Sequence, residues 1–106
     1  MVRVSWSEKA LCDLDFIHDY IAVDSRFYAR VQVERIVKAV EQLHAFPESG
    51  RKLPEFPLLP YREVIIGAYR CIYRYEPENA VVYMVTVVHG SRLLETVMVA
   101  ENDGIV

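Results

Sequence analysis

With 106 residues, 53% of them hydrophobic and 25% charged, the chain has the composition of a globular protein, and its apolar runs fall short of the roughly 20 residues that cross a bilayer. The N-terminus has no apolar stretch like that of a signal peptide, so we expect a cytoplasmic protein without a membrane partner. The net charge is −3 and is weakly positive only over residues 51–92, which argues against a general nucleic-acid binder and favours a protein partner, because phosphate binding usually needs a marked basic excess.

The first half of the sequence predicts one strand and two helices. Residues 2–6 (VRVSW) alternate apolar and polar side chains, which is typical of a strand. Ser7 can cap a helix over residues 7–23, where apolar side chains recur at helical spacing. Ser25 can cap a second helix that runs to about residue 45 and ends before Pro47, since the residue before a proline avoids helical angles. The short link between the helices predicts an antiparallel hairpin.

The second half predicts a loop followed by strands. Residues 47–60 (PESGRKLPEFPLLP) hold four of the five prolines, too many for a helix or a central strand. The period then changes to two, and short turns at 67–68 and 76–79 favour antiparallel pairing. The strands expected there are residues 61–66, 69–75 and 80–89.

The order β-α-α-β-β-β predicts an α+β fold, in which the two-helix antiparallel hairpin packs on one face of an antiparallel sheet. The length allows one hydrophobic core, so we expect a single domain over residues 1–106, with an acidic and partly flexible tail at 93–106. Cys12 and Cys71 have no metal-ligand spacing and are expected to be buried, reduced thiols.

The strand at residues 69–75 (YRCIYRY) contains the most informative side chains. Alternation turns its tyrosines and its cysteine toward the helices, and turns Arg70, Ile72 and Arg74 to the opposite face. The two arginines would lie about 13 Å apart, at roughly 3.3 Å per residue, and each guanidinium can bind a carboxylate or a phosphate through two hydrogen bonds. An ordinary solvated strand face would show the same pattern.

Basic residues and a histidine lie at two other places. Arg51 and Lys52 directly follow Gly50, and His89 precedes Arg92 at the end of the last strand. A histidine in that position can act as a general acid or base, although a histidine with no carboxylate or nucleophile beside it is more often structural. Ser91 does not complete a triad, because no positioned acid can be identified. With no phosphate-binding glycine loop and no zinc-ligand spacing, we expect neither a cofactor nor a metal.

Four segments together resemble the RelE/ParE toxin superfamily, and particularly its ParE-like plasmid-stabilisation branch: VSWSEKALCDLDFIHDYIA, LHAFPESGRKLPE, YREVIIGAYRCIYRYE and VTVVHGSR. They cover about residues 4–92 in the family's order and spacing. The resemblance implies the fold described above and a cognate antitoxin, whose C-terminal segment folds onto the toxin as a helix in a groove or a strand at a sheet edge. It implies contact with DNA only through that antitoxin.

The resemblance leaves the target open. The ParE branch is associated with growth inhibition through a protein contact with DNA gyrase and has no nuclease set, which suits this sequence better, so we expect a binding protein rather than an enzyme. The RelE branch cleaves mRNA on the ribosome without a metal, and here the residues for that role would be Arg70, Arg74, His89 and Arg92. Against it, the chain has only three lysines and no tyrosine after Tyr83. A degenerate member that only binds DNA-bound antitoxin is a third alternative.

The residues expected to bind the target or the antitoxin combine the basic, aromatic and apolar groups of the loop and the strands. They are Arg51, Lys52, Leu53, Phe56, Arg62, Arg70, Arg74, His89 and Arg92.

Overall fold

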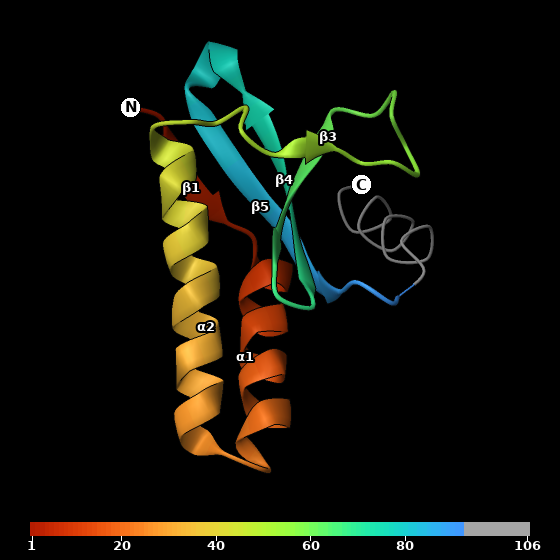
Figure 1. Cartoon of the computed structure of the whole chain (residues 1–106). Coiled ribbons are helices and arrows are strands. Elements are labelled where there is room, and N and C mark those ends of the chain that lie inside the picture. The colour runs from red at the N-terminus through yellow and green to blue at the C-terminus, as the bar shows by residue number, and fades with distance from the viewer. Residues whose placement is uncertain (93–106) are drawn as a thin grey trace.

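In the computed structural model, which describes residues 1–92, two antiparallel helices pack against one face of a five-stranded sheet (Figure 1). The predicted tail at 93–106 lies outside the described residues. In chain order the elements are β1 (Arg3–Trp6), α1 (Glu8–Ala22), α2 (Arg26–Glu41), a 3-10 turn (Gln42–His44), β2 (Arg51–Lys52), β3 (Tyr61–Ile66), β4 (Tyr69–Glu76), a second 3-10 turn (Pro77–Asn79) and β5 (Val81–His89).

Both helices begin where the sequence places their caps. The Ser7 hydroxyl accepts a hydrogen bond from the Ala10 N–H at 3.0 Å, and the Ser25 hydroxyl accepts one from the Tyr28 N–H at 3.1 Å. Each bond satisfies a backbone donor that the first helical turn leaves without a partner. Within residues 1–92, no helix is both long enough and apolar enough to span a membrane.

The sheet has the strand order β1-β5-β4-β3-β2. Neighbours among β3 to β5 are antiparallel, as predicted, and the unpredicted edge strand β2 also pairs antiparallel with β3. However, β1 runs parallel to β5, from Arg3 beside Val81 to Trp6 beside Met84. The sheet is therefore mixed rather than wholly antiparallel, because the helix hairpin separates β1 from the other strands and no tight turn fixes its direction. The α+β class and the helix hairpin on one sheet face are confirmed.

Each face of the sheet has its own apolar core. The helices cover one face, where Ile36, Leu43, Cys71 and Tyr73 are buried and the other tyrosines of β4 are partly buried against them. The proline-rich loop covers the other face, with Leu53 buried against Ile72 and with Phe56 packed beside them. The loop is therefore part of the fold, not a linker.

The two cysteines differ. Cys71 is buried in the helix-side core, and burial raises its pKa to about 12, because the thiolate would lose its hydration. Cys12 is exposed on α1, so the prediction of a buried thiol is wrong there. The apolar side chains that α1 buries lie on the neighbouring face, with Leu14 and Ile17 among them.

Candidate functional site

Arg70 does not face solvent as the alternation of β4 suggests. Its side chain lies beneath the proline-rich loop, and the residue is only 8% exposed. Its Nε donates to the carboxylate of Glu63 on the adjacent strand β3, which is also buried. Its two terminal nitrogens donate to both oxygens of Glu55 in the loop, at 2.6 and 2.9 Å. The guanidinium is thus held by two carboxylates of its own chain.

Arg51 on β2 adds a fourth charge to this arrangement. Its Nε donates to the second oxygen of Glu63 at 2.6 Å. Positive and negative groups therefore alternate across the sheet in the order Arg51, Glu63, Arg70 and Glu55, which we call the charge ladder. The hydrogen bonds to Glu55 and Glu63 raise the pKa of the Arg70 guanidinium. The hydrogen bonds and the positive charge of Arg70 lower the pKa of Glu55. The ladder fixes the loop over the sheet.

Glu55 gives the fold an acid-sensitive contact. The hydrogen bonds from Arg70 hold the pKa of Glu55 at about 2, against an ordinary value of 4.5. Because the folded-state pKa is lowered, the contact is fully stabilising above about pH 4.5 and is lost as the pH falls toward 2. We expect the wild type to be more stable than Glu55→Gln at neutral pH, and the difference to shrink over that acid range. Urea unfolding of both proteins across pH measures this, and a constant difference would contradict it.

Arg74 and Arg62 do not converge on Arg70. Arg74 lies over the Tyr83 ring at 5.2 Å and pairs with Glu76 at 3.0 Å, toward the far end of β4 from His89. Its Nε is buried without a hydrogen-bond partner among the described residues. Arg62 donates to the Gly50 carbonyl at 2.9 Å and so holds the start of the loop.

The apolar and basic residues of the loop also divide. Leu53 is fully buried and Phe56 half-buried, so both support the loop from inside the second core. Lys52 and Arg51 are exposed on the edge strand β2. Of these four predicted residues, only the basic pair is exposed.

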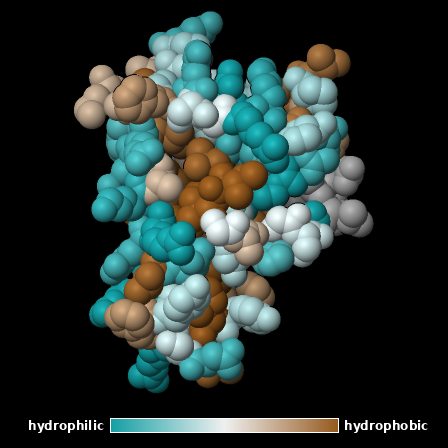
Figure 2. Space-filling view, in the orientation of Figure 1, coloured by the Kyte–Doolittle hydropathy of each residue, from teal (hydrophilic) through white to brown (hydrophobic). Residues whose placement is uncertain are grey.

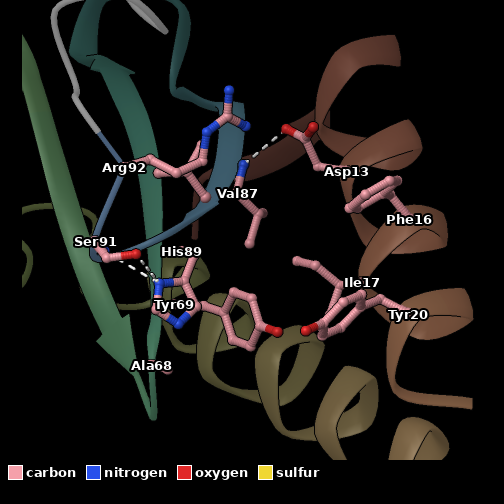
Figure 3. A pocket seen from close by; sticks show the side chains of 11 residues that line it. Asp13, Phe16, Ile17, Tyr20, Ala68, Tyr69, Val87, His89, Ser91 and Arg92 are labelled. Atoms are coloured by element: carbon pink, nitrogen blue, oxygen red, sulfur yellow. Dashed lines mark hydrogen bonds between the residues drawn. The ribbon is translucent and has the colours of Figure 1, made fainter. Parts of the chain in front are cut away.

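A cleft of about 400 Å³ lies between α1 and the end of β5 and contains two predicted residues, His89 and Arg92 (Figure 3). The Ser91 N–H and hydroxyl lie 3.1 and 2.7 Å from His89 Nδ1, and the Tyr69 ring meets the His89 ring edge-on at 5.7 Å. Because an N–H can only donate, Nδ1 is the acceptor and the proton of the neutral ring lies on Nε2. No carboxylate among residues 1–92 bonds to His89, so no triad forms there.

Asp13, on the α1 wall of the same cleft, serves the fold. Its carboxylate accepts from the Thr86 hydroxyl at 2.6 Å and from the Val87 N–H at 3.0 Å, and Lys9 donates to it at 3.2 Å. These bonds join α1 to β5 next to the bulge in the β4–β5 pairing. The Asp13 carboxylate, which lines the cleft, is therefore engaged in hydrogen bonds within the fold.

Sequence reasoning missed several residues of this region. Phe16 and Tyr20 on α1 are 73% and 70% exposed and line the cleft, with Tyr20 and Tyr69 projecting toward one another from opposite walls (Figure 3). Their spacing of four residues was the available signal, since it places both on one helix face. Figure 2 shows apolar surface in a broken band down the middle of the face drawn, with hydrophilic surface on both sides. Exposed apolar and aromatic side chains gathered on one surface favour an interaction there.

No metal site is evident in the described part of the chain, where no three His, Cys, Asp or Glu side chains cluster. The chain is 33% identical over 94 residues to Toxin RelE2 of Caulobacter vibrioides, which covers 88% of this chain and 100% of that protein. The solved chromosomal ParDE system from P. aeruginosa contains a chain that superposes with a TM-score of 0.70 at 22% identity, covering 84% of this chain and 96% of that one.

A chain of the intact E. coli RelBE toxin–antitoxin complex gives a TM-score of 0.60 at 17% identity, covering 87% of this chain and 100% of that one. These superpositions match the helix hairpin and the sheet described above, and at such low identity they speak for the fold. The family described as the ParE toxin of the type II toxin–antitoxin system parDE matches residues 4–94. The chain therefore belongs to the ParE family and is a toxin of a type II toxin–antitoxin system.

Proposed function

We propose that this toxin inhibits growth in the cytoplasm by a protein–protein contact with DNA gyrase. The observation that carries the proposal is the charge ladder, in which Arg70 and Arg51 are engaged by Glu55 and Glu63. Cleavage of RNA needs a base, an acid and free cations around the phosphate that reacts. An arginine held by two carboxylates does not supply such a cation, so the geometry supports binding more than catalysis.

We propose that the antitoxin contacts the toxin through a short helix or strand that enters the cleft between α1 and the end of β5. Phe16 and Tyr20 offer it exposed aromatic surface, and Arg92 offers a positive charge. Aromatic residues and arginines are the groups that contribute most in protein interfaces. The solved ParDE and RelBE relatives come from systems that pair a toxin with an antitoxin, which supports a cognate antitoxin for this chain too.

Supercoiling of relaxed plasmid by purified gyrase tests the proposal. Added toxin is expected to reduce supercoiling, and the cognate antitoxin is expected to restore it. Unchanged supercoiling at toxin concentrations well above that of gyrase would contradict the proposal. If expression without antitoxin also left growth unaffected, the chain would be a degenerate member that only binds its antitoxin.

A second candidate function is ribosome-dependent mRNA cleavage, and one observation favours it. His89, Arg92 and Tyr69 line a single cleft, which brings together a potential base, a cation and an aromatic ring. The relative in Caulobacter vibrioides also bears the name RelE2. Toeprinting of translated message should then show cuts that disappear in His89→Ala, whereas intact message would rule this function out.

A further inference from the structure

A second cleft, of about 440 Å³, lies where the proline-rich loop meets the end of β5, and Arg51, Glu55, Arg70 and His89 line it. Glu55 reaches into it from the loop and covers the terminal nitrogens of Arg70. We propose that Glu55 is an internal ligand, which occupies a phosphate-binding position on Arg70 and excludes external phosphate groups from the cleft.

The geometry of the contact supports this assignment. Glu55 meets Arg70 with both carboxylate oxygens, at 2.6 and 2.9 Å from the two terminal nitrogens. A phosphate presents a pair of oxygens to a guanidinium fork in the same way. The third donor of Arg70, its Nε, is committed to buried Glu63, which fixes the direction of the fork. The outer face of Arg70 is thus preorganised for a two-oxygen anion.

The charge of the cleft supports it as well. The charge ladder is neutral while Glu55 is present, because two arginines face two glutamates. Without the Glu55 carboxylate, the ladder carries one net positive charge in a cleft that also contains the His89 ring and the Ser91 hydroxyl. A charge with little solvent exposure attracts an anion more strongly than an exposed one does, and Arg70 is only 8% exposed.

Tethering explains why the wild type should reject phosphate. Leu53 is fully buried and Phe56 packs beside it, so apolar anchors hold the loop on both sides of Glu55. A ligand tethered by a short segment acts at an effective concentration on the order of millimolar or above. An external phosphate must compete with that concentration. The same anchors should keep the loop in place when the carboxylate is removed.

The test compares Glu55→Gln with Glu78→Gln. Glu78 lies in the exposed turn between β4 and β5, away from the cleft, and its replacement changes the net charge by the same amount. One arm titrates inorganic phosphate and follows the melting temperature, which rises when a ligand binds the folded state. The other arm follows fluorescence anisotropy of a short single-stranded RNA oligonucleotide.

We expect Glu55→Gln to bind at least one of the two probes tenfold or more tighter than the wild type and Glu78→Gln. A gain with both probes identifies a simple phosphate site, and a gain with RNA alone identifies a site for the nucleic-acid backbone. Adding Arg51→Gln to Glu55→Gln should weaken the gain. Equal affinities in Glu55→Gln and Glu78→Gln would overturn the proposal, because net charge alone would then account for binding.

Folding does not confound this comparison. Each variant's own thermal transition is recorded with and without phosphate, so a destabilised but folded Glu55→Gln still reports binding, and Glu55→Ala provides a second variant. The inference goes beyond the proposed function and does not depend on the toxin's target, because neither binding assay contains gyrase or the ribosome. A failed gyrase assay would leave it standing, and a failed phosphate assay would leave the gyrase proposal standing.

Discussion

Arg70→Ala is expected to lower the free energy of unfolding by about 3–5 kcal/mol, the range for removing one partner of a buried ion pair. Glu63 is buried, and after the substitution its only remaining cation in the charge ladder is Arg51, whose side chain is 58% exposed. Glu55 would also lose its partner, which removes the ionic link between the loop and the sheet. Urea unfolding followed by circular dichroism measures the change.

Arg74→Ala is the matched control on the same strand. Its side chain is partly exposed, pairs with Glu76 and lies over Tyr83. Contacts of this kind contribute about 0.5–1 kcal/mol each at the surface, so we expect a much smaller effect. If the two variants unfolded with the same free energy, the structural role of Arg70 would be contradicted.

Because Arg70→Ala is expected to destabilise the fold, a loss of toxicity in this variant would not by itself indicate a catalytic role for Arg70. An arginine in the YRCIYR run of β4 invites a catalytic interpretation, but here the residue holds the loop that covers the second core. Arg70→Lys separates charge from geometry, because lysine keeps the charge and lacks the two-pronged fork. We expect Arg70→Lys to be intermediate in stability.

Gly50→Ala is expected to destabilise the fold by about 2–3 kcal/mol, near the upper end for overpacking a well-packed site. A Cβ at Gly50 would lie 2.6 Å from the Tyr73 hydroxyl oxygen and 2.7 Å from the Glu63 carbonyl oxygen. The Gly50 N–H also donates to the Tyr73 hydroxyl at 2.9 Å, and that hydroxyl donates to the Pro47 carbonyl at 2.8 Å. Since one clash is with backbone of β3, no side-chain rotation relieves it.

Gly90→Ala is the control for this prediction. Its added Cβ would have the Ala68 carbonyl oxygen as its nearest neighbour, at 3.4 Å, which is an ordinary contact. We expect its thermal midpoint to lie close to that of the wild type, well above that of Gly50→Ala. Similar midpoints for the two alanine variants would show that the loop start has more freedom than the structure indicates.

The features that could be predicted from the sequence are those set by neighbouring residues. Ser7 and Ser25 begin the helices because the bonds they accept come from three residues further along the chain. The alternation in β4 correctly turns Tyr73 and Cys71 toward the helices. The resemblance to the RelE/ParE superfamily, built on segments of this kind, is confirmed by the family match.

The features that could not be predicted depend on residues distant in sequence. Glu55 lies 15 positions before Arg70. The prolines of its loop exclude a helix there, but they do not indicate which part of the sheet the loop covers. The direction of β1 depends on its pairing with β5 at the other end of the described chain. The two-residue strand β2 exists because Arg51 and Lys52 pair with β3, and so short a segment has no periodicity to detect.

Glu63 illustrates the limit most clearly. It is the one acidic residue in the largely apolar strand YREVII, and alternation places it on the sheet face opposite to that of Val64. A buried carboxylate requires a partner of opposite charge, so the position could have been recognised as half of an ion pair. Which cations complete the pair becomes visible only in the folded sheet, where Arg51 and Arg70 flank it.

The central claim, that this toxin acts by binding rather than by cutting RNA, is tested most directly by titrating a fixed amount of gyrase with folded toxin and measuring the supercoiling that remains. The structure, with Arg70 and Arg51 engaged by carboxylates, leads us to expect inhibition that follows the toxin-to-gyrase ratio and reverses on adding antitoxin. Full supercoiling at a large excess of toxin, from a preparation that cleaves ribosome-bound mRNA, would contradict the claim.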